Sequence, residues 1–256
     1  MEADIRQTQN RLLDMAKQVT AILDKHNIRY TMYYGTLLGA IRHKGFIPWD
    51  DDFDLGVLDE QYDEGMEWLR MEMPESLFLE DGKSEPLYFH AWAHVKDLKT
   101  MAKCDYYLQD NLYSHHGLSI DLYRIKRVKV RELCDEADKE YLKYIVRRRK
   151  LGLMTDEEYE RRLEFYGNID NWFWLDASKT ETLEQLDREV YSNIYTSRTK
   201  LELADFLPFK RYTFEDTEFW GPQNSDAILK VFYGDDYMKL PEEKDRKSHY
   251  SEVVFL

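Results

Sequence analysis

The chain of 256 residues is 43% hydrophobic, so it can bury a substantial core, either as one large domain or as a catalytic core with an extension. A formal net charge of -14 argues against a nucleic-acid partner, because affinity for phosphate backbones comes from clustered Lys and Arg. Its two cysteines lack metal-ligand spacing, and no apolar run is long enough to span a bilayer. We therefore expect a cytoplasmic protein with at most peripheral contact with the inner face of a membrane.

The first half of the sequence alternates helical and strand patterns. Apolar residues at helical spacing predict amphipathic helices, and runs of β-branched and aromatic residues predict strands. Gly35 ends the first predicted strand and leads into a short helix. In chain order the patterns predict a helix over 3–26, a strand over 28–34, a helix over 36–42, a loop over 43–49, a strand over 52–57, a helix over 60–73, and strands over 77–79, 88–95 and 118–125.

The second half has a different character, because helical periodicity and charge prevail from residue 126 to about residue 200. Near the end, Asn224 caps a further predicted helix and Gly234 follows its last residue. The predicted fold class is α+β, with a mixed β-sheet core flanked by helices over residues 1–126. Residues 127–256 are predicted to form a mainly helical extension whose C-terminal segment folds back towards the site.

Gly35 and Thr36 lie where a predicted strand meets a predicted helix. Free backbone N–H groups and a hydroxyl at the positive end of a helix dipole form a natural seat for phosphate. The alternative is a simple strand-to-helix turn that needs glycine for its backbone angles.

Asp52 and Asp54 follow within 20 residues of this turn, in a segment that alternates acidic and apolar residues. Side chains two apart on a strand share a face, so these carboxylates are predicted to point together and to hold divalent cations. The alternative is a solvated acidic turn that caps a helix. Asp121, between apolar neighbours in a strand-like run, is the best candidate for a third carboxylate, unless it forms a structural salt bridge with a nearby Arg.

The run over residues 34–56, YGTLLGAIRHKGFIPWDDDFDLG, resembles the signature of the LicD/fukutin family. A later run over 233–241, YGDDYMKLP, with Arg246 and His249 beyond it, resembles the C-terminal signature of that family. The resemblance implies a nucleotidyltransferase-like fold in the residue 1–126 core. Residues 130–210 match no part of the family that we can place, and Phe53 and Leu55 stand where branched aliphatic residues are expected.

By this resemblance the protein is expected to be a metal-dependent phosphotransferase of cell-surface polysaccharide biosynthesis. It would move a phospho-alcohol, with phosphocholine favoured, from a CDP-alcohol such as CDP-choline to a hydroxyl of a free or lipid-linked saccharide, releasing CMP. Asp52, Asp54 and Asp121 would hold Mg²⁺ or Mn²⁺ and form the catalytic set. Asp121 could also take the proton of the attacking hydroxyl.

Seven residues are predicted to bind substrate. Arg42 and Lys44 follow the phosphate turn and could contact diphosphate oxygens, unless they are surface residues. Trp49, together with Tyr33 and Tyr34, could form an aromatic wall for a quaternary ammonium group, unless it packs in the core. The set comprises Gly35, Thr36, Arg42, Lys44, Trp49, Arg246 and His249.

Two other functions fit the same residues. A nucleotidyltransferase would use the same metal site to pass a nucleotide from an NTP to a small molecule or a sugar phosphate. A non-catalytic binding protein would use the acidic run only to bind calcium or a partner. Product analysis separates the first of these, since nucleotide transfer releases pyrophosphate and phospho-alcohol transfer releases CMP.

Overall fold

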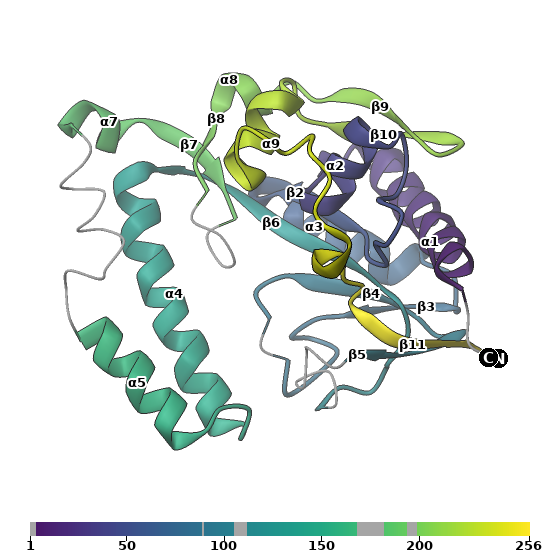
Figure 1. The fold of residues 1–256 in the computed structure, drawn as a ribbon, viewed down its shortest axis with the longest axis horizontal. Helices are drawn as coiled ribbons and strands as arrows, with labels where there is room; N and C mark the ends of the chain where they lie inside the picture. The colour runs from purple at the N-terminus through teal and green to yellow at the C-terminus, as the bar shows by residue number, and fades with distance from the viewer. Residues whose placement is uncertain (1–3, 89, 105–111, 168–181, 194–198) are drawn as a thin grey trace. The chain divides into compact units, whose positions relative to one another are not determined.

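The computed structural model describes residues 4–88, 90–104, 112–167, 182–193 and 199–256. The chain divides into two compact units (Figure 1). Unit 1 comprises Met1–Arg124 and Ala204–Leu256, and unit 2 comprises Ile125–Leu203. The sequence-based division had one boundary, at residue 126, whereas the structure groups the last 53 residues of the chain (204–256) with the first unit.

The sheet of unit 1 has the strand order β1-β2-β6-β4-β3. The pairs β1–β2, β4–β6 and β3–β4 are antiparallel. The backbone N–H of Asp121 donates to the carbonyl of Phe53, which joins the beginning of β2 to β6. The strands are β1 (Tyr30–Met32), β2 (Asp54–Leu58), β3 (Leu77–Glu80), β4 (Ala93–Asp97) and β6 (Ser119–Lys129).

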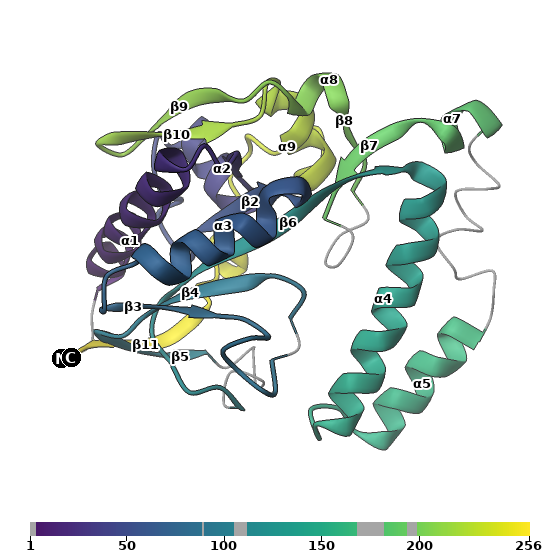
Figure 2. The same cartoon turned by 180° about the vertical axis from the view of Figure 1, so that it is seen from behind.

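Helices flank this sheet, as Figures 1 and 2 show from opposite sides. The first, α1 (Ile5–Lys25), begins at a capping box in which the Asp4 side chain accepts from the N–H of Gln7. It contacts α3 (Asp59–Glu72), which packs on β2 and β3, while α2 (Tyr34–Arg42) contacts β2 and α9 (Ser225–Tyr233). The apolar residues of α1 from Leu12 to Leu23 that face the sheet are buried, so this helix covers the core.

Shorter elements complete unit 1. Strand β5 (Thr100–Cys104) pairs antiparallel with the last strand, β11 (Tyr250–Phe255). A hairpin of β9 (Lys210–Phe214) and β10 (Thr217–Gly221) buries Phe214 and Phe219 against Phe53. The remaining elements are α8 (Leu203–Phe206) and a 3₁₀ turn (Glu243–Asp245).

Unit 2 is helical with a small sheet. The end of β6, Lys126–Lys129, pairs with β7 (Glu189–Ser192), and β7 pairs with β8 (Leu201–Glu202). Its helices are α4 (Val130–Lys150), α5 (Asp156–Gly167) and α7 (Leu183–Asp187). Within the ranges that the structure describes, we find no helix with the length and apolar character needed to cross a membrane.

The α+β class with a sheet core flanked by helices is confirmed. Two local predictions were wrong. The first strand ends at Met32, so Gly35 lies inside α2, and β2 begins at Asp54, so Asp52 precedes the strand instead of sharing its face. The predictions also missed β5 and the strands from β7 to β11.

Candidate active site

Four aspartates line a cavity of about 350 Å³ in unit 1. The cavity lies where α2, β2, β4, β6 and the C-terminal segment meet. The sequence predicted three of these aspartates, and the structure adds Asp50. The four residues are Asp50, Asp52, Asp54 and Asp121.

The N-terminus of α2 holds the acidic segment against the cavity. A side chain at Gly35 would place its Cβ only 3.1 Å from Oδ2 of Asp50, so any larger residue would displace the Asp50 carboxylate. The backbone N–H of Gly35 hydrogen-bonds the Asp54 carboxylate. Thr36 is buried, and its Oγ1 accepts from the N–H of Asp54 at 2.8 Å. Gly35 lines the cavity, whereas the Thr36 hydroxyl fixes the start of β2.

The carboxylates of the acidic segment disfavour one another's charge. Burial and the neighbouring Asp52 raise the pKa of Asp50 well above its usual range. Burial, Asp52 and Asp121 do the same to the pKa of Asp54, and burial also raises the pKa of Asp52. Burying like charges together is unfavourable unless a cation joins them. A set of carboxylate oxygens is also the donor set that Mg²⁺ and Mn²⁺ prefer, so these residues fit a divalent cation.

Asp121 stands in a row of side chains that crosses three strands. It lies opposite His94 of β4, and His94 lies opposite Glu80 of β3. His94 Nε2 is 3.6 Å from Asp121 Oδ1, and His94 Nδ1 is 3.0 Å from Glu80 Oε2. Trp92 Nε1 and the Tyr123 hydroxyl donate to Asp121 Oδ2 at 3.1 and 3.0 Å. These contacts orient the carboxylate towards the cavity.

Asp121 forms no ion pair with an arginine among the described residues, so the salt-bridge alternative is not realised there. The nearest arginine along its strand, Arg124, pairs with Asp59 and Asp63 of α3. Its guanidinium also lies over the ring of Tyr62, 4.3 Å from the centroid. This charge therefore serves the packing of α3 on the sheet.

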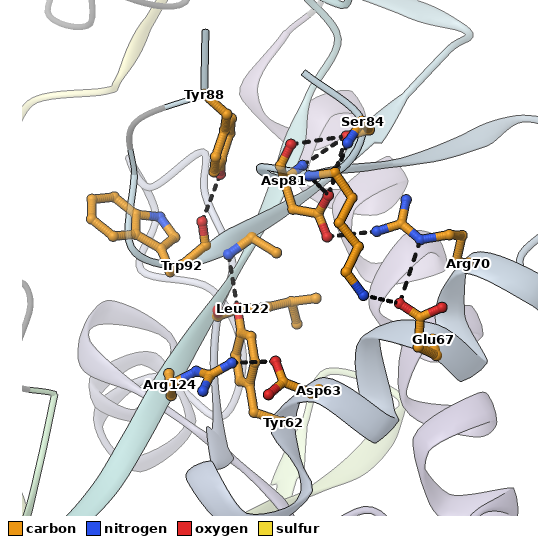
Figure 3. A network of polar contacts seen from close by, with 12 residues as sticks. Tyr62, Asp63, Glu67, Arg70, Asp81, Ser84, Tyr88, Trp92, Leu122 and Arg124 are labelled. Atoms are coloured by element: carbon orange, nitrogen blue, oxygen red, sulfur yellow. Dashed lines mark hydrogen bonds and ion pairs between the residues drawn. The ribbon is translucent and has the colours of Figure 1, made fainter. Parts of the chain in front are cut away.

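A polar network beside α3 ties together β4 and β6, two strands whose residues line the cavity (Figure 3). The Tyr62 hydroxyl donates to the carbonyl of Leu122 at 2.7 Å and accepts from the N–H of Ala93 at 2.9 Å. It thus ties β6 to β4 beside Asp121. The Tyr88 hydroxyl donates to the carbonyl of Trp92 at 2.6 Å and fixes the start of β4.

Asp51 ties the C-terminal segment to the acidic segment. Its carboxylate is buried and accepts from the backbone N–H groups of His249 and Tyr250 at 2.7 and 2.9 Å. His249 Nδ1 lies 3.1 Å from Asp51 and 3.4 Å from Asp52, and the bond to Asp51 raises the pKa of His249 to about 9. A protonated imidazole therefore lies beside these carboxylates at neutral pH.

The tightest group of possible metal ligands in the described part of the chain is Asp50, Asp51 and His249, with ligand atoms within 4.8 Å of one another. Two of the three are already engaged with each other, because Asp51 accepts from both the backbone and the ring of His249. We therefore regard Asp51 and His249 as a structural latch. Asp52, Asp54 and Asp121 share the cavity but are not gathered as tightly.

Four of the predicted binding residues lie away from this cavity. Arg42 donates to the carbonyls of Tyr237 and Lys239. Lys44 is exposed, with a positive φ of 62°, and does not line the cavity. The Arg246 guanidinium lies over the ring of Trp49, 4.7 Å from its centroid. Arg42 and Trp49 line a second depression of about 510 Å³.

The second depression adjoins the cavity, because Leu38, Ile47 and Tyr233 line both. The cavity itself has an aromatic wall that differs from the predicted one. Tyr34 lines it, but Tyr33 is fully buried behind it and Trp49 lies in the second depression. The wall is completed by Trp92, Tyr123 and Tyr233.

The sequence-based predictions missed several residues of the cavity, above all those of β4. His94 and Lys96 are both buried, and both line the cavity from one face of this strand. The signal that could have found them is a pair of ionisable residues two apart within an otherwise apolar predicted strand.

Sequence comparisons show which known proteins this chain resembles. A family model described as LicD/FKTN/FKRP, nucleotidyltransferase domain, matches residues 27–116. Lipopolysaccharide cholinephosphotransferase LicD of Haemophilus influenzae is 24% identical over 264 aligned positions, which cover 98% of each chain. Human ribitol 5-phosphate transferase FKRP is 46% identical over 46 residues, 18% of this chain and 9% of its own. The similarity to the first of these relatives thus extends over both units.

Proposed function

Because the chain carries the nucleotidyltransferase domain of the LicD/fukutin family, we propose that it transfers phosphocholine from CDP-choline to a sugar hydroxyl of a glycan and releases CMP. The observation that supports this most is the cavity in which the acidic segment of α2–β2 faces Asp121 of β6. Its size suits the phosphate groups and alcohol of a donor with a sugar hydroxyl beside them.

Asp52, Asp54 and Asp121 would hold one or two Mg²⁺ or Mn²⁺ ions, and Asp50 adds a fourth carboxylate on the same side. The ion would neutralise charge on the donor's diphosphate and on the departing CMP. The carboxylates of this cavity destabilise one another when they are all ionised, so metal binding and ionisation favour each other.

The acceptor hydroxyl would attack the phosphorus that carries choline. A new P–O bond forms, the bond from that phosphorus to the bridging oxygen breaks, and CMP leaves with that oxygen. Asp121 Oδ1 can take the hydroxyl proton, since Trp92 and Tyr123 both donate to Oδ2 and leave Oδ1 facing His94 and Ser119. Positioning of this kind accounts for much of the catalysis of phosphoryl transfer.

The aromatic wall supports choline as the transferred alcohol. The rings of Trp92 and Tyr123 are 5.4 Å apart, and Tyr34 lies edge-on to Tyr123 at 5.3 Å. Aromatic faces beside carboxylates attract a quaternary ammonium group, whereas an uncharged polyol such as ribitol or glycerol gains no cation–π stabilisation.

The test is CMP release from CDP-choline, CDP-glycerol and CDP-ribitol with a saccharide acceptor, in Mg²⁺ and after chelation with EDTA. We expect Mg²⁺-dependent release that is fastest with CDP-choline. Pyrophosphate release from an NTP, without CMP release from any CDP-alcohol, would instead favour nucleotide transfer. Release that persists after chelation would refute the metal site.

A further inference from the structure

Lys96 is a buried lysine that faces the cavity. Its residue is only 3% exposed, yet it lines the cavity together with the four aspartates. Among the lining residues that the structure describes, it is the single Lys or Arg. An ammonium group in this position has lost most of its hydration, which costs free energy unless another group replaces the water.

No such group is supplied within the described part of the chain, where the side chain of Lys96 has neither a hydrogen bond nor an ion pair. Glu80, also fully buried, is one candidate, because burial raises the pKa of Glu80 to about 7 and the charge of Lys96 opposes that rise through space. However, Glu80 Oε2 contacts His94, and its Oε1 has no hydrogen-bond partner among those residues. Lys96 thus lines the cavity without a hydrogen bond or ion pair to Glu80 among the described residues.

The register of the sheet places Lys96 on the β4–β6 wall of the cavity, on the same face as Asp121. Lys96 pairs across strands with Ser119, and the adjacent row holds His94 and Asp121. The carboxylates of Asp50, Asp52 and Asp54 come from the other side, from the segment between α2 and β2. An anion in the cavity would have the carboxylates of the α2–β2 segment on one side, and the ammonium of Lys96 together with Asp121 on the other.

We propose that Lys96 is the phosphate-binding residue of this cavity and that its ammonium contacts a non-bridging oxygen of the donor's diphosphate. This assignment rests on the proposed function for the identity of the donor. A lysine is a compact point charge with three donors, which suits an oxygen that changes position during transfer. Lys96 takes the role that sequence proximity had suggested for Arg42 and Lys44.

The test measures binding of inorganic diphosphate and of CDP by calorimetry in the presence of Mg²⁺, so that it needs no turnover. The variant Lys96→Met keeps the aliphatic length and removes the charge. We expect it to bind both anions about 10- to 100-fold more weakly, the loss expected for one charge-assisted hydrogen bond. Lys96→Arg should retain part of the affinity. Lys99→Met, an exposed lysine three residues along, should bind like the wild type.

A structural role for Lys96 as the counter-charge of Glu80 predicts a different outcome. The double variant Glu80→Gln/Lys96→Met removes both charges of this pair at similar volume, so it also guards against a single variant that fails to fold. If Lys96 binds phosphate, the double variant should bind diphosphate and CDP as weakly as Lys96→Met does. If the double variant regains wild-type affinity, or if Lys96→Met binds both anions as the wild type does, the assignment is overturned.

Failure of the donor assignment would look different. Lys96-dependent binding of diphosphate, without CMP release from any CDP-alcohol, would refute the proposed function and support the phosphate site. CMP release by Lys96→Met with an unchanged KM would support the function and refute the phosphate site. A wild-type protein that binds neither diphosphate nor CDP would also refute the phosphate site.

Discussion

Two regions of unit 1 bury carboxylates, and they stabilise them in opposite ways. At the end of β4, Asp97 is fully buried, and Arg11 of α1 binds both of its oxygens at 2.6 and 2.9 Å. Thr100 Oγ1 and the N–H of Lys99 complete its partners. In the cavity, Asp54 is also buried, but other carboxylates surround it. One region satisfies its charge within the fold, and the other leaves charge to be satisfied by a ligand.

This difference shows in the pKa values. Although burial acts to raise the pKa of Asp97, the hydrogen bonds from Arg11, Lys99 and Thr100 and the charge of Arg11 together outweigh it, and the pKa is lowered. Burial and like charges raise the pKa of Asp54 well above its usual range, with only a backbone N–H opposing them. Asp97 thus contributes to stability, whereas Asp54 costs stability, as expected of a carboxylate kept for the proposed metal site.

The variant Asp54→Asn should give the largest effect, a loss of CMP release of roughly 1,000-fold or about 4 kcal/mol of transition-state stabilisation. It removes a buried carboxylate that repels its neighbours, so the melting temperature of the metal-free protein should stay the same or rise. Steady-state rates and differential scanning fluorimetry measure the two quantities. Loss of both together would indicate misfolding, and wild-type activity would remove Asp54 from the site.

The variant Asp97→Asn should have the opposite profile. It leaves Arg11 without its buried partner, which should cost about 3 kcal/mol of unfolding free energy, with kcat unchanged in the fraction that remains folded. Urea unfolding gives the free energy. A neutral effect on stability would mean that the two buried regions do not differ as we argue.

The pH dependence of stability tests the lowered pKa of Asp97 directly. The folded pKa of Asp97 is lower than its unfolded value near 4, so its contribution is fully present above that value and is lost as the pH falls through the folded pKa. We therefore expect the acid limb of the stability curve, below about pH 4, to be shallower in Asp97→Asn than in the wild type. Identical acid limbs would contradict the lowered pKa.

A third variant tests whether the cavity's aromatic wall recognises a cation. Trp92→Leu should raise the KM for CDP-choline about tenfold, the size of one cation–π contact, and should change the KM for CDP-glycerol less. Trp92→Phe is the matched control, because it also loses the N–H that bonds Asp121 but keeps an aromatic face. Equal changes with both donors would show that Trp92 acts only through Asp121.

The sequence revealed the acidic side of the cavity because that side is local. Gly35 and Asp54 are close along the chain, and contacts within α2 and β2 place them together. The same closeness in the sequence suggested that Arg42 and Lys44 bind the diphosphate, but neither residue lines the cavity. They follow the helix to its other end, and seven residues at 1.5 Å each carry Arg42 roughly 10 Å from Gly35. Residues that are close to Gly35 in the sequence can therefore lie a whole helix length away from a site at the N-terminus of α2.

The β4 side of the cavity could not be predicted, because it depends on strand order and register. Lys96 and Trp92 reach the cavity only because β4 pairs with β6 and places His94 opposite Asp121. A shift of one residue would turn Lys96 to the other face. No local pattern fixes that register, since the contacts that set it, such as the bonds of Tyr62 to Ala93 and Leu122, come from a distant helix.

The smallest effect is expected in unit 2, where charges pair in water. Arg131 and Asp187 lie 3.2 Å apart, with side chains 48% and 56% exposed. Water already stabilises both ions, so a double-mutant cycle of Arg131→Ala and Asp187→Ala should give a coupling energy below about 0.5 kcal/mol that vanishes in 1 M NaCl. Catalysis should be unaffected. A coupling energy as large as the loss of unfolding free energy in Asp97→Asn would mean that exposure to water does not determine how much a charge contributes to stability in this protein. The contrast between the surroundings of Asp97 and Asp54 would then have no physical basis.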